Sequence, residues 1–153
     1  MNAEKDYEDL LRLFNRHKVR YCIVGAYAVA FYARPRYTKD MDLLVEPSPA
    51  NAERVLKALQ EFGFRSLKLS GKDLTAKGRI VQLGYEPLRI DLVTSIEGVD
   101  FQQVWEHKKQ GRYGSQKAFF IGLNELIRNK KKSNRRQDQA DIELLRSARR
   151  RTR

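Results

Sequence analysis

The sequence of 153 residues contains one cysteine, Cys22, which excludes an internal disulfide and is better suited to a small core residue than to a nucleophile. It contains no CxxC, HExxH or GxxxxGK[ST] pattern, and this disfavours zinc sites and P-loop chemistry. No apolar run reaches the length of about eighteen residues that a membrane span needs. The N-terminal stretch is acidic and amphipathic, unlike a signal peptide, so we expect a cytoplasmic protein.

The composition is that of a well-solvated globular chain. Hydrophobic residues make up 41% and charged residues 33% of the sequence, and the length suits one domain with a substantial core. No internal repeat or low-complexity linker divides it. We expect a core over residues 1–122 and a basic helical segment over residues 123–153 that packs on the same domain.

Positive charge is concentrated near the C-terminus. The formal net charge is +12, and the stretch from Arg128 to Arg153 has eleven Lys and Arg against three Asp and Glu, a net of +8. Such a concentration favours a polyanionic partner, because basic side chains release counterions from nucleic acid. The alternative is a solvated tail that contacts nothing, and the sequence leaves both interpretations open.

The stretch from Tyr21 to Glu46 organises the rest of the chain. It is YCIVGAYAVAFYARPRYTKDMDLLVE, an apolar run that stops at Gly25 and a second apolar run that follows two aspartates. The order predicts a strand over 20–25, a helix over about 27–33 that ends before a proline, and a second strand over 39–46. A glycine after a buried strand lets the backbone approach a phosphate, and the helix that follows offers N–H groups at its positive end.

Asp40 and Asp42 are expected to point to one face of the second strand, while Met41 points into the core. Two close carboxylates repel each other unless a divalent cation or basic groups neutralise them, and magnesium suits this arrangement because it binds carboxylates together with substrate phosphates. A pair of solvated aspartates at a strand end is the alternative interpretation, because Asp-x-Asp is common. Gly25 places an anion site next to this cation site.

These residues resemble a known family. The arrangement of Gly25, a helix and Asp40-x-Asp42, led in by Arg36 and Thr38, resembles the nucleotidyltransferase fold of the DNA polymerase β superfamily. It is most similar to the small bacterial nucleotidyltransferases of abortive-infection and toxin–antitoxin systems. That family has Gly-Gly or Gly-Ser at the turn, whereas this chain has Ala26, which keeps the backbone N–H and lacks a hydroxyl. Further matches are a third carboxylate, Asp91 in LRIDLVTS, and a C-terminal segment with Lys130, Arg135, Asp138 and Asp141.

The resemblance implies an α+β fold of the two-layer kind, with a mixed, mostly antiparallel sheet, helices packed on it and a C-terminal helical segment. It implies that Asp40, Asp42 and Asp91 hold Mg²⁺ or Mn²⁺ and that Asp91 is the general base. The donor would be a nucleoside triphosphate such as ATP. Its phosphates would be supported by residues of the turn and by basic or polar side chains, namely Gly25, Ala26, Arg36, Thr38, Lys130 and Arg135. For Arg36, a salt bridge to Asp42 is the alternative.

The acceptor has several candidates. RNA, plausibly tRNA, suits a toxin-type enzyme and the basic C-terminal segment. A partner toxin protein suits an antitoxin-type enzyme, and a small molecule such as an aminoglycoside would call for an acidic acceptor pocket. A catalytically idle nucleic-acid-binding module is the alternative from outside the enzymes.

Periodicity and turn residues predict the remaining elements. We expect helices over 3–17, 50–62, 101–107, 123–132 and 136–149, strands over 65–69, 80–83 and 88–94, a loop over 71–78 and a hairpin over 112–121. Ser48 or Asn51 is expected to cap the helix over 50–62, and Gly63 to end it. For Trp105, a place in the core is favoured over stacking on a base. Capping or a salt bridge to Arg135 is favoured over metal binding for Asp138 and Asp141.

Overall fold

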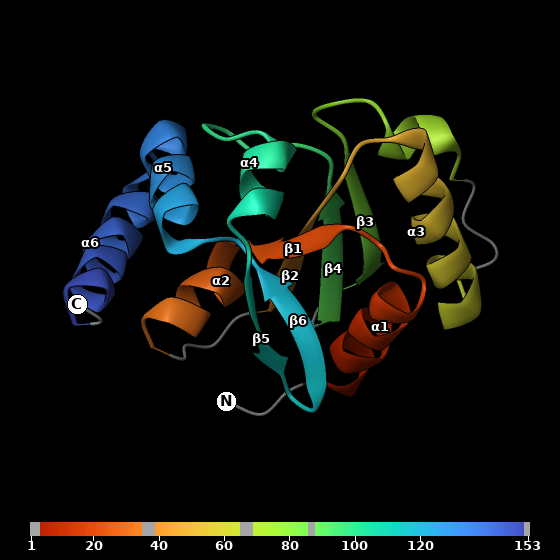
Figure 1. Cartoon of the computed structure of the whole chain (residues 1–153), viewed down its shortest axis with the longest axis horizontal. Coiled ribbons are helices and arrows are strands. Elements are labelled where there is room, and N and C mark those ends of the chain that lie inside the picture. The colour runs from red at the N-terminus through yellow and green to blue at the C-terminus, as the bar shows by residue number, and fades with distance from the viewer. Residues whose placement is uncertain (1–3, 35–38, 65–68, 86–87, 152–153) are drawn as a thin grey trace.

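The computed structural model describes residues 4–34, 39–64, 69–85 and 88–151. Along the chain, the elements are α1 (Lys5–Arg16), β1 (Tyr21–Val24), α2 (Gly25–Tyr32), β2 (Asp40–Val45), α3 (Pro49–Phe62), the short 3₁₀ helix η1 (Gly71–Leu74), β3 (Ile80–Tyr85), β4 (Leu88–Val93), α4 (Phe101–Glu106), β5 (Lys109–Tyr113), β6 (Gln116–Phe120), α5 (Leu123–Ser133) and α6 (Arg136–Arg151) (Figure 1).

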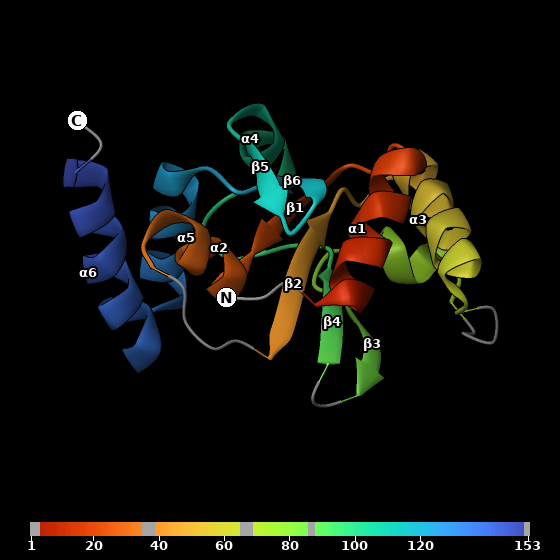
Figure 2. The same cartoon turned by 90° about the horizontal axis from the view of Figure 1, so that it is seen from below.

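The sheet has the strand order β3-β4-β2-β1-β6-β5. The β1–β2, β3–β4 and β5–β6 pairs are antiparallel, and the β1–β6 and β2–β4 pairs are parallel. The predicted α+β class and the mixed, mostly antiparallel sheet are therefore confirmed. Helices α1 and α3 lie together on one side of the sheet, and α2, α5 and α6 lie on the other (Figure 2).

Alternation along the two central strands divides the core into two clusters. Met41 and Leu43 pack in a cluster with α1 and α3, whereas Leu44 packs in a second cluster with α2, α4 and α5. Successive side chains of a strand point to opposite faces, so both faces of β1 and β2 are buried, and their apolar runs are continuous for this reason. Asp40 and Asp42 fall on the face opposite Met41, as predicted.

Several local predictions are confirmed by backbone geometry. Ser48 caps α3, since its Oγ accepts a hydrogen bond of 3.2 Å from the N–H of Asn51, and Gly63 ends this helix with φ of 117°. The stretch 71–78, predicted as a loop, contains η1 instead, because Ser70 and Asp73 form a capping box and Leu74 is fully buried. The strand predicted over 65–69 falls mainly on residues outside the described ranges.

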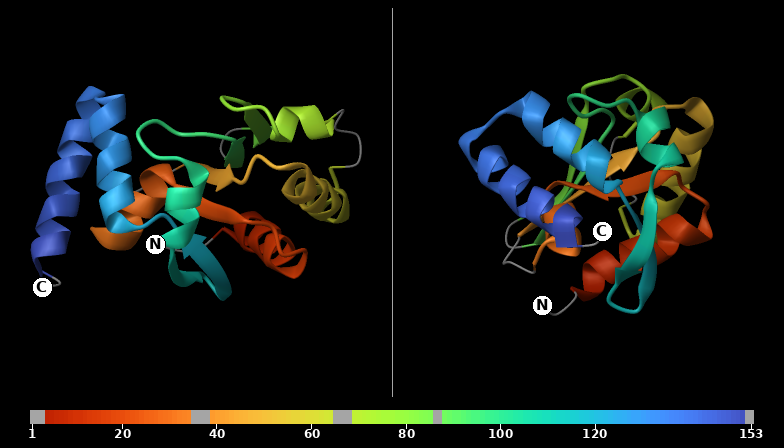
Figure 3. Two further views of the ribbon diagram at one scale, coloured as in Figure 1. Left: turned by 45° about the horizontal axis from the view of Figure 1, so that its top comes forward. Right: turned by 60° about the vertical axis from the view of Figure 1, so that its left-hand side comes forward.

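The C-terminal half also follows the predicted order of elements. The β5–β6 hairpin turns at Gly114 and Ser115, and α5 and α6 lie side by side at one end of the molecule (Figure 3). One side of α6, formed by Ile142, Leu145 and Ala148, is apolar and buried. Within the described ranges, no helix is both long and apolar enough to cross a bilayer.

Candidate active site

The turn between β1 and α2 brings the backbone against a carboxylate. Gly25 has φ of +68°, a conformation that side chains disfavour, and a Cβ added to it would collide with Oδ2 of Asp42. The antiparallel ladder explains the contact, because Val24 lies opposite Asp42. The predicted neighbourhood of the glycine turn and the aspartate pair is therefore present, and glycine is required there for two separate reasons.

Asp91 joins the pair through the parallel register of β2 and β4, in which Asp42 lies opposite Asp91 and Asp40 opposite Arg89. The three carboxylates therefore share one face of two neighbouring strands. Burial, reinforced by the negative charges of Asp91 and Asp40, raises the pKa of Asp42 to about 6. The positive charges of Arg89 and Lys130 act in the opposite direction.

Arg89 is a site residue that the sequence analysis missed. Its Nη2 lies 2.8 Å from Oδ2 of Asp40 and 3.2 Å from Oδ2 of Asp91, so the guanidinium bridges the two carboxylates. The Arg-x-Asp spacing on β4 was a signal, since it puts Arg89 and Asp91 on one face. The partnership with Asp40, in contrast, depends on how β2 and β4 pair.

The carboxylates are suitable donors for a hard divalent cation. Oδ1 of Asp40 and Oδ1 of Asp91 are buried and have no hydrogen-bond partner among the described residues, so each keeps an oxygen for another ligand. Among the residues that the structure describes, however, no three acidic, His or Cys side chains are grouped closely enough to hold a metal ion. Because the Arg89 guanidinium bridges Asp40 and Asp91, it must move for these carboxylates to share a cation.

Lys130 and Arg135 line a cavity of about 520 Å³ together with Gly25, Asp42 and Asp91. Lys130 is buried, and its Nζ lies 3.2 Å from both Oδ1 of Asp138 and Oδ2 of Asp141. The side chain of Arg135 is 74% exposed. The structure thus brings together five of the predicted site residues around one hollow.

Asp138 holds the two basic residues in place. Its Oδ2 accepts hydrogen bonds of 3.0 Å from both Nε and the backbone N–H of Arg135 and one of 2.6 Å from Oγ of Ser133. Burial alone would raise the pKa of Asp138, but these hydrogen bonds and the one from Lys130 outweigh burial and hold it well below its usual range. The predicted salt bridge of Asp138 to Arg135 is confirmed, and Asp141 pairs with Lys130.

The remaining predicted residues have different outcomes. Ala26 is half-buried in the first turn of α2, next to Gly25. Arg36 and Thr38 lie outside the described residues. Asn129 and Ser133 also line the cavity and were not predicted. They lie on either side of Lys130 in the sequence of α5. Helical spacing alone does not distinguish such residues from those of an ordinary polar helix face.

Together, the mixed sheet, the glycine turn and the acidic face of β2 and β4 define a small nucleotidyltransferase. The sequence matches, over residues 3–153, the family described as "Nucleotidyl transferase of unknown function (DUF2204)", and the chain belongs to this family. The predicted resemblance to the nucleotidyltransferases is thereby confirmed. No curated protein matches the sequence.

Solved structures of nucleotidyltransferases share the fold. The lincosamide antibiotic adenylyltransferase LnuA, bound to lincomycin, is 16% identical with a TM-score of 0.63, and the match covers 96% of this chain and 98% of LnuA. TM1012 from Thermotoga maritima, a candidate nucleotidyltransferase, is 15% identical with a TM-score of 0.56 and coverages of 95% and 86%. An antigenic nucleotidyltransferase-like protein from Paracoccidioides brasiliensis is 14% identical with a TM-score of 0.57 and coverages of 96% and 77%.

Proposed function

We propose that the protein transfers a nucleoside monophosphate from a nucleoside triphosphate to an acceptor hydroxyl, with magnesium as cofactor and RNA as acceptor. One observation carries the proposal: a single cavity joins the Gly25 turn, the carboxylates of Asp42 and Asp91, and the basic side chains of Lys130 and Arg135. A triphosphate needs a close backbone, a cation and positive side chains, and the cavity has groups for each.

In this proposal, Asp40, Asp42 and Asp91 hold the divalent cation. When bound, the cation would neutralise phosphate charge and make the acceptor hydroxyl more acidic. Gly25 lets the backbone lie directly against Asp42, whose Oδ2 takes the place that a Cβ would fill, so a phosphate held at the turn would lie beside this carboxylate and its cation. Lys130, fixed by Asp138 and Asp141, and the exposed Arg135 offset the remaining negative charge.

The reaction forms a bond between the acceptor oxygen and the α-phosphorus and breaks the bond from that phosphorus to the pyrophosphate oxygen. Asp91 accepts the proton of the acceptor hydroxyl, and pyrophosphate leaves with the pair of electrons. Arg89 bridges Asp40 and Asp91. Its guanidinium has to leave Asp91 before this carboxylate can act as a base.

The strong positive charge supports RNA as the acceptor, because a polyanion gains most from a protein with a net charge of +12. A second candidate is a small hydroxylated molecule. It is supported by the similarity in fold and length to LnuA, which is named as an adenylyltransferase and was solved with lincomycin. ATP is therefore the first donor to test.

The test incubates the protein with each α-labelled nucleoside triphosphate, Mg²⁺ or Mn²⁺, and in turn cellular RNA, lysate protein or lincomycin. We expect label on RNA, and none with Asp40→Asn. The matched control is Glu53→Gln, which removes an exposed carboxylate on α3 and should transfer normally. Label on a protein would instead identify a partner protein, such as a toxin, as the acceptor. Label on lincomycin would favour the small-molecule candidate, and no label on any acceptor would refute the transferase proposal.

A further inference from the structure

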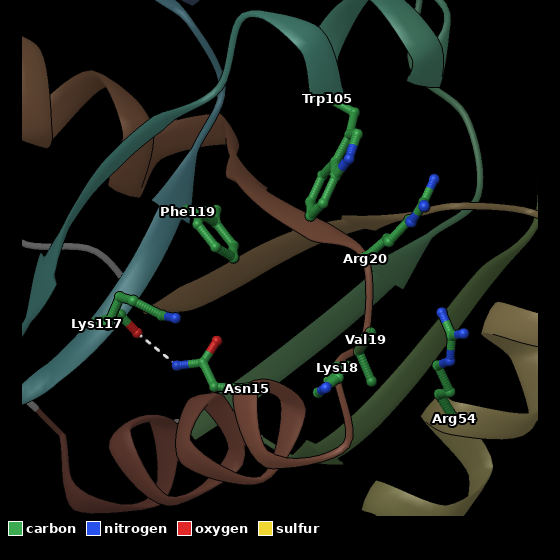
Figure 4. A pocket seen from close by; sticks show the side chains of 8 residues that line it. All are labelled: Asn15, Lys18, Val19, Arg20, Arg54, Trp105, Lys117 and Phe119. Carbon is green, nitrogen blue, oxygen red and sulfur yellow. Dashed lines mark hydrogen bonds between the residues drawn. The ribbon is translucent and has the colours of Figure 1, made fainter.

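A second cavity, of about 390 Å³, lies at the end of β1 opposite Gly25 and shares no lining residue with the candidate active site (Figure 4). Its lining includes two aromatic side chains and four cations, and none of its lining residues is acidic. We call it the basic aromatic cavity and define it by Lys18, Arg20, Arg54, Trp105, Lys117 and Phe119.

The aromatic part of this cavity has two rings from different elements. Trp105 of α4 and Phe119 of β6 meet edge to face, with ring centroids 5.5 Å apart and planes at 74°. Both side chains are half-buried: they pack on the core and also line the hollow, where Figure 4 shows them close together. The place in the core predicted for Trp105 therefore accounts for only part of its surroundings.

The cations come from three segments: Lys18 and Arg20 from the connection between α1 and β1, Arg54 from α3, and Lys117 from β6. The guanidinium carbon of Arg20 is 5.7 Å from the centre of the Trp105 ring, and Nζ of Lys117 is 5.3 Å from that of Phe119. Two residues outside the lining cover part of Trp105: Nζ of Lys108 is 3.9 Å from its ring centre, and the Phe101 ring stacks on it at 5.8 Å, so a base would meet only the ring surface that lines the cavity. Arg20 forms a salt bridge of 3.1 Å to Glu46. Within the described ranges, no acidic side chain forms a salt bridge with the other three cations. The cavity therefore has more positive charge than the protein itself neutralises.

The backbone around the cavity is held firmly. The buried side chain of Asn51 accepts a hydrogen bond of 2.8 Å from the N–H of Arg20 and donates to the carbonyls of Arg20 and Glu46. Nδ2 of Asn15 donates to the carbonyl of Lys117 at 2.7 Å. Lys18 follows α1 with φ of +56°, a left-handed conformation that is uncommon for residues other than glycine and asparagine. The cations thus project from fixed positions.

We propose that the basic aromatic cavity binds single-stranded RNA, with one base against the two rings and the adjoining phosphates among the four cations. Aromatic surfaces stack any base, and a basic rim follows the backbone, which is how proteins bind single strands without reading their sequence. A free nucleotide would place its phosphates near only some of the cations, because they are spread over three segments. A longer strand reaches all of them.

The role of the bound RNA as acceptor rests on the proposed function. Arg20 and Gly25 mark the two ends of β1, and five strand positions span about 17 Å. An RNA segment of a few nucleotides that is bound in the basic aromatic cavity can therefore extend to the candidate active site. Binding itself requires neither metal nor nucleoside triphosphate, so it can be measured separately from transfer.

The chain provides its own probe, because Trp105 is the only tryptophan. Metal-free protein is titrated with an oligouridylate of about twelve nucleotides, a length within the range of known single-strand sites, while tryptophan emission is followed. We expect the emission to be quenched at about 50 mM salt and the affinity to fall steeply toward about 200 mM salt. Uridine monophosphate at the same nucleotide concentration should leave the emission unchanged, and equal quenching by it would overturn the proposal in favour of a mononucleotide site.

Two variants test the cations. In Arg54→Gln with Lys117→Gln, both exposed positions, we expect roughly tenfold weaker binding and a slope of log affinity against log salt that is smaller by about 1.4. The control is Lys57→Gln, an exposed charge on α3 outside the cavity, which should retain the slope. An unchanged slope in the double variant, or no quenching with the unmodified chain, would overturn the proposal. Quenching without label transfer to RNA would refute only the role of the bound RNA as acceptor.

Discussion

Asp42→Asn should stabilise the protein while it removes activity. The pKa of Asp42 rises from its ordinary value of 3.8 to about 6, chiefly because the carboxylate is buried. A difference of one in pKa corresponds to about 1.4 kcal/mol, so the ionised carboxylate costs the folded protein about 3 kcal/mol above pH 6. An amide has no charge to bury, and in a chain of this length this gain raises Tm by about 6–12 °C.

The sign of the pH dependence follows from proton uptake. Because the pKa of Asp42 is higher in the folded than in the unfolded chain, the folded protein binds the extra proton between about pH 4 and pH 6. Protonation of Asp42 therefore increases the free energy of unfolding of the unmodified protein as pH falls through that window. The advantage of Asp42→Asn should therefore be largest above pH 7 and disappear near pH 4.

Urea unfolding of both proteins, without divalent cations, at intervals from pH 4 to pH 8 measures this difference. Other titrating groups are common to the two chains and cancel in the comparison. Glu53→Gln, an exposed charge removal on α3, is the control and should follow the unmodified protein throughout. If the free energies of unfolding of the unmodified protein and Asp42→Asn change in parallel with pH, burial does not destabilise the ionised form of this carboxylate and the argument is refuted.

Three other substitutions test the site. Without metal, Arg89→Gln should lower the free energy of unfolding by about 2 kcal/mol, because the partly buried carboxylates of Asp40 and Asp91 lose this partner. Calorimetry should then show a larger increase in Tm on adding Mg²⁺ than in the unmodified protein. Gly25→Ala should cost more than about 1 kcal/mol, because of its positive φ and the collision with Asp42, and normal stability in urea would contradict the turn geometry. Asp138→Asn should cost about 3 kcal/mol by weakening the pairing of buried Lys130, whereas Glu143→Gln, an exposed change on the same helix, should unfold like the unmodified chain.

Local pattern was sufficient for the first part of the site. The apolar run, the glycine and the second run predict β1, the turn and β2 because each depends on neighbours in the sequence. The period of two in a strand then places Asp40 and Asp42 on one face, whatever the rest of the chain does. The roles of Lys130 and Arg135 came from the family resemblance instead, and the structure brings both to the cavity.

Features that depend on strand pairing or on distant segments could not be predicted in this way. The bridge from Arg89 to Asp40 requires the parallel register of β2 and β4, which a single sequence does not fix. The basic aromatic cavity combines α1, the connection from α1 to β1, α3, α4 and β6, and each contributes residues that are ordinary by themselves. The capping box of η1 was visible in the sequence as Ser70-x-x-Asp73, but four residues are too few for a periodic pattern.

The Arg89 bridge also determines how the protein should behave when metal is withdrawn. Proteins whose folds depend on an ion lose their structure when a chelator removes it. Here, a permanently charged guanidinium already supplies a positive partner for two of the three carboxylates. We therefore expect the chain to stay folded during purification and storage in a chelating buffer, and the proposed transfer activity to return when magnesium is restored.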